Sequence, residues 1–314
     1  MTSCWIITEG MAGTENQCLG VAEALGVMPV IKRIGLKQPW KSLSPFLGFE
    51  QPLSFTGDTL DAPYPDLVLA SGRKAIAAAR YIKKASKGET FVVQIQDPRI
   101  SPKHFDLVAV PHHDPTRGDN VVVTHAAPNR ITDEKLKVAA QDFKDVLAPL
   151  PQPRVAILIG GNSKAYKMTA EITRKLCANL LALAQSGYGL MVTASRRTGE
   201  ENAAIINESL RHENIYVWDG QGENPYFAFL GTADFMIVTA DSVSMISEAA
   251  TTGKPVYMLP LDGGTPRFNK FHNHLLENGI IRTFDGSLKE YSYAPIRDAK
   301  LVAWEIKSRI GKPL

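Results

Sequence analysis

The chain has 314 residues, a formal net charge of +3 and 44% hydrophobic residues. This length can bury a full core and is about twice the usual size of a single domain, so it predicts two domains. Charged residues make up only 21% of the sequence. Because a protein that binds nucleic-acid phosphates needs a dense field of lysine and arginine, nucleic acid is not expected as a partner.

The cysteines, Cys4, Cys18 and Cys177, are odd in number and far apart in the sequence. This pattern favours a reducing compartment over a disulfide framework or a zinc site. No apolar run approaches the length that crosses a bilayer. We therefore expect a cytoplasmic protein with no metal cofactor, whose membrane contact is peripheral, at the inner face of the membrane.

In the first half of the chain, short apolar runs alternate with helical patterns. The runs predict strands, and the patterns between them predict helices; the strands are 4–8, 30–34, 66–70, 91–95, 107–110 and 121–124, and the helices are 17–25, 73–85 and 133–147. Such alternation is typical of βαβ units in a mainly parallel sheet.

Three prolines within residues 149–153 then predict a linker, because proline continues neither a helix nor a central strand. Beyond it the same alternation predicts strands 155–159, 189–193, 215–218, 235–238 and 256–259, and helices 170–185, 201–211, 226–230, 243–251 and 296–310.

This organisation predicts an α/β protein with two doubly wound, Rossmann-like domains that face each other across a cleft. The first domain, over 1–148, is expected to bind an acceptor. The second, over 154–290, is expected to bind a nucleotide sugar. The tail, 291–314, is expected to pack its helix back on the first domain.

Polar loops follow two strands of the second domain, where ligands of doubly wound sheets bind. Glycines allow close approach to a ligand, hydroxyls and amides donate hydrogen bonds, and cations offset phosphate charge. We therefore expect a diphosphate near Gly160, Gly161, Asn162, Ser163, Lys164, Ser195 and Arg196. Structural turns with solvated side chains are the alternative.

A third loop begins a helix with Ser242 and Ser244, and Glu248 follows Ser244 by four residues on nearly the same helix face. The serines either cap the helix or face a phosphate. The carboxylate of Glu248 suits the two hydroxyls of a ribose, since acidic residues play this role in other nucleotide folds. Helix capping with a solvated glutamate is the alternative.

Loops after the strands of the first domain are candidates for the acceptor side. Arginines there suit an acidic group of the acceptor or pair with acidic neighbours. The candidate residues are Gly10, Gly13, Thr14, Ser71, Arg73, Gln96 and Arg99, and the candidate catalytic bases, which the sequence does not rank, are Glu9, Glu15 and Asp97.

The segment from Lys32 to Phe49 interleaves cations with large apolar residues. Such a segment suits the surface of an anionic bilayer and access to a lipid-linked acceptor. A short surface helix whose aromatic residues pack on the domain is the alternative.

Together, six segments resemble the mitochondrial fission ELM (elongate mitochondria) family, in particular its bacterial members. These segments are residues 8–16, 71–73, 94–99, 160–166, 193–197 and 239–255. The C-terminal segments also resemble the GT-B transferase that adds N-acetylglucosamine to lipid-linked peptidoglycan precursors. That resemblance assigns Gly160–Ser163 to the donor diphosphate, Ser242 and Ser244 to the donor pocket, and Glu248 to the ribose. The histidine of the transferase's first loop is missing here, so the catalytic base is not carried over.

The resemblance implies a metal-independent GT-B glycosyltransferase of the hexosyltransferase type. Its donor is a nucleoside diphosphate sugar, and its acceptor is an envelope or lipid-linked molecule. The alternative is a non-catalytic adaptor that keeps the GT-B fold and recruits a protein partner, as in organelle fission.

Overall fold

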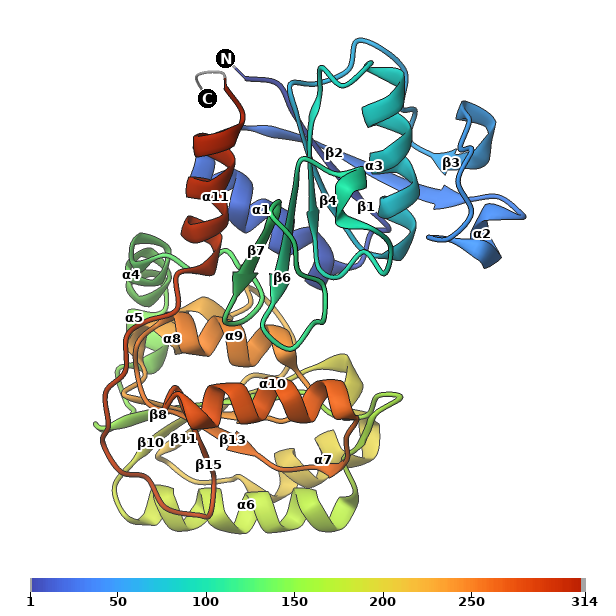
Figure 1. Ribbon diagram of the computed structural model, residues 1–314. Coiled ribbons are helices and arrows are strands. Elements are labelled where there is room, and N and C mark those ends of the chain that lie inside the picture. The colour runs from blue at the N-terminus through green and yellow to red at the C-terminus, as the bar shows by residue number, and fades with distance from the viewer. Residues whose placement is uncertain (1, 312–314) are drawn as a thin grey trace. The chain divides into compact units, whose positions relative to one another are not determined.

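The computed structural model describes residues 2–311. The chain divides into two compact units: unit 1 takes the chain up to Arg130 and resumes at Arg297, and unit 2 is Ile131–Ile296. A mainly parallel sheet with helices on both faces forms the centre of each unit (Figure 1). The predicted α/β class with two Rossmann-like units is therefore confirmed.

The sheet of unit 1 has the strand order β3-β2-β1-β4-β5-β6-β7. All neighbours in it are parallel except β3, which pairs with β2 in the antiparallel direction. The strands are β1 (Cys4–Thr8), β2 (Pro29–Leu36), β3 (Phe55–Gly57), β4 (Leu67–Ser71), β5 (Phe91–Ile95), β6 (Leu107–Pro111) and β7 (Val121–Thr124). Its central strands are mostly apolar because helices cover both faces.

The helices of unit 1 are α1 (Ala12–Leu25), α2 (Trp40–Leu43), α3 (Arg73–Ala85) and α11 (Asp298–Arg309). On one face of the sheet, α1 and α11 pack in the same apolar cluster. On the other face, the alanines of α3 allow close packing against the strands. Unit 1 thus has two core layers, and the last helix of the chain completes one of them.

Helix α11 is held in unit 1 by apolar contacts and by a buried acid. Val302, Ala303 and Ile306 lie in the cluster that contains α1, and Figure 1 shows the red α11 beside the blue α1. Asp298, the first residue of the helix, accepts hydrogen bonds from the amides of His125 (3.2 Å) and Ala126 (2.7 Å), just after β7. Burial raises the pKa of this carboxyl to about 6, although the two amides oppose the shift.

The sheet of unit 2 has the strand order β11-β10-β8-β12-β13-β15, with all neighbours parallel. Renumbered along the unit, this is the 3-2-1-4-5-6 order of the Rossmann fold. Its strands are β8 (Arg154–Ile159), β10 (Gly189–Ala194), β11 (Ile215–Val217), β12 (Phe235–Thr239), β13 (Val256–Leu259) and β15 (Ile281–Thr283), and a separate antiparallel pair joins β9 (Tyr166–Lys167) to β14 (Asp262–Gly263).

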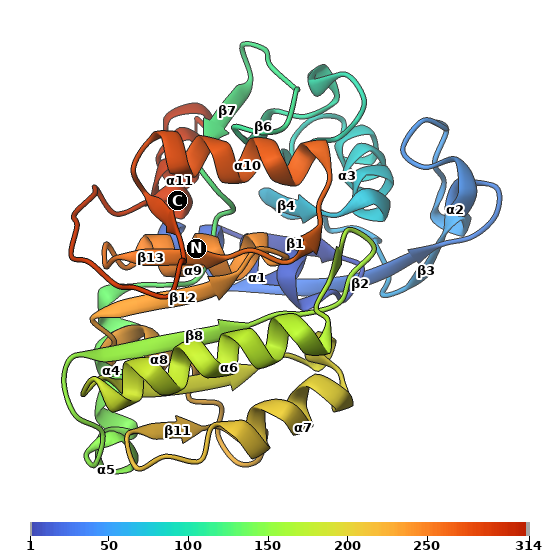
Figure 2. The same ribbon diagram turned by 90° about the horizontal axis from the view of Figure 1, so that it is seen from below.

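Helices α6 and α7 cover one face of this sheet, and α8 and α9 cover the other (Figure 1). Figure 2 shows α6 on its face of the sheet, running roughly along β8. The helices of unit 2 are α4 (Asp133–Asp142), α5 (Lys144–Leu147), α6 (Ala170–Gln185), α7 (Glu200–Ser209), α8 (Tyr226–Thr232), α9 (Val243–Thr251) and α10 (Pro266–Glu277).

The unit boundary lies earlier in the chain than the predicted end of the first domain at residue 148. Helix α4 packs on α8 within unit 2, and the approach is close: a Cβ at Gly231 of α8 would lie 2.6 Å from the carbonyl oxygen of Leu136. The prolines at 149–153 therefore end α5 and lead into β8 inside unit 2. They do not link the two units.

Several short elements were not predicted. They are β3, β9, β14 and β15, together with the longer α10, whereas α2 is a short helix of the kind that the alternative interpretation of residues 32–49 expects. The first helix begins at Ala12 rather than at 17, so Gly13 and Thr14 lie in its first turn and not in a loop. Among the described residues, no helix is both long and apolar enough to cross a membrane.

Candidate functional site

Three loops of unit 2 meet at the carboxyl ends of β10, β8 and β12, which are neighbours in the sheet. The amide of Gly160 donates to Oγ1 of Thr239 (2.7 Å), and the carbonyl of Gly160 accepts from Oγ1 of Thr198 (2.6 Å) and Oγ of Ser195 (2.9 Å). The amide of Asn162 donates to the carbonyl of Arg197 (2.8 Å). The predicted loops are thus brought together, and they hold one another.

Gly160 and Gly161 are required by contacts within the protein. A Cβ at Gly160 would lie 2.3 Å from Oδ1 of Asp241, and one at Gly161 would lie 2.3 Å from the carbonyl oxygen of Arg197. Both glycines are buried. The sequence analysis explained these glycines by the approach of a ligand, whereas here a neighbouring loop occupies that space.

The polar groups of Asn162 and Ser163 also form hydrogen bonds within their own loop. Oγ of Ser163 accepts from the amides of Ala165 (3.1 Å) and Tyr166 (3.0 Å), and Oδ1 of Asn162 accepts from the amide of Met168 (3.0 Å). The amide of Ser163 donates to the carbonyl of Tyr166. The idea that the amides of Gly160, Asn162 and Ser163 cradle a diphosphate is therefore corrected, because protein oxygens already accept from them.

Next to Gly160 lies an ion pair that the sequence analysis missed. Oδ2 of Asp241 is 2.8 Å from Nη2 of Arg197, and the aspartate side chain is fully buried (0% exposed) while the arginine side chain is 44% exposed. A buried carboxylate is costly without a positive partner. Arg197 therefore has one edge fixed by Asp241 while much of its guanidinium remains open to solvent.

The sequence predicted that the neighbouring Arg196 binds the diphosphate, and this residue is exposed. Ser195, also predicted, uses its hydroxyl to accept from the amide of Arg197 (3.2 Å) besides donating to Gly160. One signal for the pair was present in the sequence. Asp241 comes two residues after β12, Gly160 comes directly after β8, and adjacent parallel strands bring such positions together.

The N-terminus of α9 lies directly after Asp241. Oγ of Ser242 accepts from the amide of Met245 (3.3 Å), so this hydroxyl caps the helix, as the alternative interpretation had it. Ser244 stands half-buried in the first turn. The first amides of a helix have no intrahelical acceptor and form its positive end, so α9 offers an anion the backbone donors that the Gly160 loop does not.

Glu248 lies one helical turn after Ser244 and is half-buried. Its Oε2 accepts a hydrogen bond from the hydroxyl of Tyr226 at 2.5 Å. Burial raises the pKa of Glu248 to about 7, against the opposing effect of that bond, and burial also raises the pKa of Tyr226 well above its ordinary value. Tyr226 thus orients the carboxyl, and burial favours its protonated form.

In unit 1, each candidate base has a partner. Glu9 accepts from the amide of Lys74 (2.8 Å) at the start of α3 and pairs with the Lys74 ammonium (3.0 Å). Glu15 pairs with the Arg33 guanidinium (2.8 Å). Asp97 accepts from Oγ1 of Thr116 (2.7 Å) and from the amide of Arg99 (2.8 Å). Glu9 and Asp97 thus hold loops at this edge of the sheet, and Glu15 joins α1 to β2.

The acceptor-side candidates also lie at the carboxyl edge of the unit 1 sheet. Gln96 and Arg99 have φ of +76° and +57°, backbone conformations that are uncommon outside glycine. Nε2 of Gln96 donates to Gln17 of α1 (3.0 Å), and Nη2 of Arg73 lies 3.4 Å from the carbonyl oxygen of Lys41. Ser71 is fully buried. Of the small residues, Gly10 and Gly13 are exposed, and Thr14 bonds back to the carbonyl of Met11.

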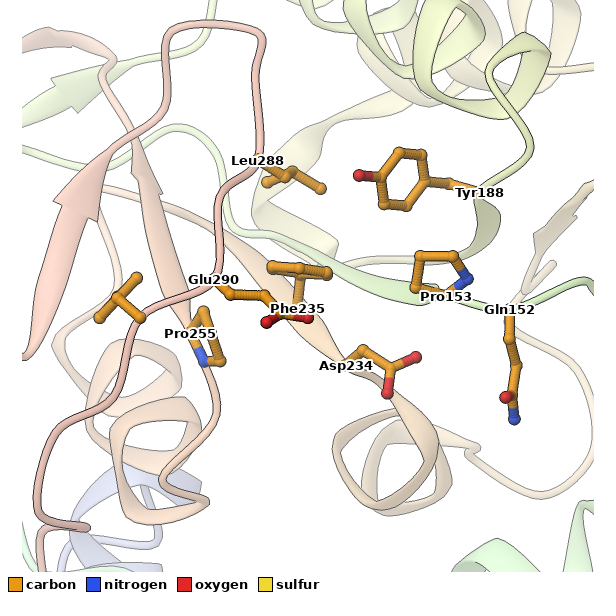
Figure 3. Close-up of a pocket in the computed structure, with 9 residues that line it drawn as sticks. Gln152, Pro153, Tyr188, Asp234, Phe235, Pro255, Leu288 and Glu290 are labelled. Atoms are coloured by element: carbon orange, nitrogen blue, oxygen red, sulfur yellow. The ribbon is translucent and has the colours of Figure 1, made fainter.

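One open cavity of unit 2 lies at the opposite edge of its sheet. It has a volume of about 690 Å³ and lies among residues that precede the strands, such as Pro153, Tyr188, Asp234 and Pro255 (Figure 3). One oxygen of Asp234 already accepts from the amide of Arg154 (2.7 Å). Because ligands of doubly wound sheets bind at the carboxyl ends of the strands, we do not assign the nucleotide to this cavity.

The topology and the loops at the carboxyl edge define an α/β protein of the GT-B type. The family model of Mitochondrial fission ELM1 matches residues 12–310, and the chain belongs to this family. The mitochondrial fission protein ELM1 of Arabidopsis thaliana is 28% identical, over 98% of this chain and 90% of its own length.

Solved structures share the fold at low sequence identity. UDP-GlcNAc 2-epimerase from Neisseria meningitidis, bound to UDP-GlcNAc, superposes with a TM-score of 0.51 at 14% identity, over 98% of this chain and all of that one. Acinetobacter baumannii MurG gives a TM-score of 0.50 at 14% identity, over 100% of this chain and 96% of that one. The family and GT-B resemblances found in the sequence are therefore confirmed.

Proposed function

We propose that this protein binds a nucleoside diphosphate sugar on unit 2 and transfers the sugar, without a metal ion, to an envelope or lipid-linked acceptor. The observation that carries the proposal is the half-exposed guanidinium of Arg197, fixed by buried Asp241 next to the N-terminus of α9. A fixed cation and a positive helix end together suit a diphosphate. The neighbouring fold that contains UDP-GlcNAc supports the same ligand class.

The proposed binding mode follows from these side chains. The diphosphate lies between Arg197 and the first amides of α9, and Lys164 and Arg196 add positive charge from exposed positions. Glu248, one turn further along α9, accepts from the ribose hydroxyls with the oxygen that Tyr226 does not use. Of the predicted donor residues, Lys164, Arg196, Ser244 and Glu248 stay in the proposal, with Arg197 and Asp241 added.

In the transfer step, the bond between the sugar carbon C1 and the diphosphate oxygen breaks, and a bond forms between C1 and an acceptor oxygen. Negative charge develops on the leaving diphosphate, where Arg197 and the α9 amides stabilise it. The proton of the acceptor hydroxyl goes to a base, for which Glu9, Glu15 and Asp97 stay candidates.

Binding is tested by following thermal unfolding with UDP, GDP and CMP and then with their sugars. A ligand present at about 100 times its dissociation constant, and bound only by the folded chain, adds about 2.7 kcal/mol to the free energy of unfolding. We expect one nucleoside diphosphate to raise the melting temperature and Arg197→Ala to abolish the rise. If no nucleotide raises it, the donor site is wrong.

The second candidate is an adaptor that keeps the fold without catalysis. Two observations favour it: the candidate bases are all engaged by protein groups, and the Arabidopsis relative is named a fission protein. Incubation with the tightest-binding sugar nucleotide separates the two functions. Release of free nucleoside diphosphate on adding envelope lipid extract supports the transferase, whereas binding without turnover supports the adaptor.

A further inference from the structure

Residues 40–53 of unit 1 display large apolar side chains to solvent. Phe46 is 73% exposed, Phe49 is 85% exposed and Leu53 is 77% exposed, and Leu43 is half exposed. Figure 1 shows the segment around α2 at the β3 edge of the unit 1 sheet. So much apolar surface within a few residues is unfavourable in water, and such clusters mark interaction sites.

The segment is held in place by hydrogen bonds. Nε1 of Trp40 donates to the carbonyl of Gly48 (3.2 Å), and Nη2 of Arg80 donates to the carbonyl of Leu47 (2.8 Å) and pairs with Glu50. Oγ of Ser44 donates to the carbonyl of Arg73 (3.1 Å). These hydrogen bonds hold the backbone of the loop while its apolar side chains point to solvent. The exposure of these side chains is therefore part of a defined loop conformation.

The backbone at Phe49 adds an independent observation. Its φ is +62°, a left-handed conformation that is unfavourable for a bulky L-residue. A glycine would fit this position without strain, yet a phenylalanine stands here, 85% exposed. Backbone strain of this kind clusters at functional sites, so it supports a role for this loop.

The charges around the tips are positive. Lys37 and Lys41 are exposed, and Glu50, which is the acidic residue within 37–54, is neutralised by Arg80. Cations beside protruding apolar side chains match the negative headgroups and acyl region of an anionic bilayer. The core of a protein–protein interface is poor in lysine, so lysines beside the tips favour an anionic lipid surface.

We propose that residues 40–53 are a membrane-docking loop, which inserts Phe46, Phe49 and Leu53 into an anionic lipid surface while Lys37 and Lys41 contact its headgroups. The proposal concerns unit 1 and goes beyond the donor site of unit 2. It stands whether the chain is a transferase or an adaptor.

The first test is co-sedimentation of the full chain with vesicles of phosphatidylglycerol and phosphatidylcholine, or of phosphatidylcholine alone. We expect binding to the anionic vesicles. Phe46→Ser/Phe49→Ser lowers the partition coefficient by about tenfold or more, because two apolar tips no longer insert. Lys37→Glu/Lys41→Glu weakens binding to anionic vesicles, and so does high salt.

The matched control is Val138→Ser/Trp304→Ser, which removes two exposed apolar side chains elsewhere and is expected to bind like the unmodified chain. Unfolding curves check that each variant is folded. The proposal is overturned if the unmodified chain does not bind anionic vesicles. It is also overturned if Phe46→Ser/Phe49→Ser binds them as tightly as the unmodified chain. It is equally overturned if, without lipid, that variant turns a dimer into a monomer, since a second copy then covers the loop.

A second test reads insertion directly. Cys4, Cys18 and Cys177 are buried, so an environment-sensitive dye reacts with a cysteine introduced at an exposed position. With Gln51→Cys, we expect a blue shift of the dye on anionic vesicles and protection from an aqueous quencher. With Glu208→Cys, an exposed position on α7, we expect neither. Equal responses at the two positions contradict insertion through this loop.

Discussion

The arginine–carboxylate pairs at the carboxyl edges of the two sheets differ in where the carboxylate lies. In unit 2, Asp241 is 0% exposed and Arg197 is 44% exposed. In unit 1, Glu15 is 15% exposed and Arg33 is 60% exposed. Water solvates the unit 1 pair when it opens, but it does not reach Asp241. The unit 2 pair therefore fixes its arginine firmly, whereas the unit 1 pair joins two surface elements.

The largest expected effect comes from Arg197→Ala. It leaves the Asp241 carboxylate buried without a cation, so we expect a loss of about 3 kcal/mol in the free energy of unfolding. Asp241→Asn is expected to cost less, because Arg197 can turn to solvent, and the double variant to recover part of the loss. Denaturant unfolding measures the free energy of unfolding of the three variants. If Arg197→Ala did not lower it, the claim that the buried Asp241 needs Arg197 would be wrong.

Gly160→Ala tests the close packing beside that pair. The new Cβ would lie 2.3 Å from Oδ1 and 2.4 Å from Oδ2 of Asp241, and the overpacking is expected to destabilise the fold by about 2 kcal/mol. Gly48→Ala is the control, since no atom lies within 4 Å of its Cβ position. Equal unfolding midpoints for the two variants would mean that Asp241 moves aside freely.

Glu248 gives the site a pH dependence. Its folded pKa of about 7 lies above the ordinary value of 4.5, so the folded state holds a proton that the unfolded chain releases. The stabilisation is fully present below pH 4.5 and is lost as the pH rises to about 7, at most about 3 kcal/mol. Glu248→Gln is expected to remove its part of the slope between pH 4.5 and 7. A slope unchanged in the variant would point to another group.

The smallest effect is expected for Arg33→Ala in unit 1. The guanidinium is mostly exposed, and exposed pairs contribute little because water replaces the partner. We expect no measurable change in the unfolding midpoint, under conditions in which Arg197→Ala is clearly destabilised. A large loss of stability in Arg33→Ala would mean that the ion pairs of the two units do not differ in strength.

Because apolar periodicity depends on local residues, the sequence predicted most parallel strands and longer helices, though not β15 or α10. It did not show that α4 belongs to unit 2, since the contact of Leu136 with Gly231 joins positions far apart in the chain. The prolines at 149–153 mark an ordinary break between elements as readily as a linker between units.

For the site, chain position alone predicted which loops gather at the carboxyl edge. It could not predict which hydrogen-bond donors the protein itself uses. Gly160 looks like a ligand-binding glycine until Asp241 is seen against it, and Ser242 looks like a phosphate ligand until it caps α9. Ser244, Glu248 and Arg197, with the exposed Lys164 and Arg196, stay as the residues with groups left for a ligand.

The return of α11 to unit 1 has a consequence for the order of folding during synthesis. Unit 2 is a continuous stretch, Ile131–Ile296, whereas unit 1 lacks Val302, Ala303 and Ile306 until all of unit 2 has been synthesised. Domains usually fold one after another as they leave the ribosome. Here the unit that is begun first completes its core last, after the whole of the second has been made.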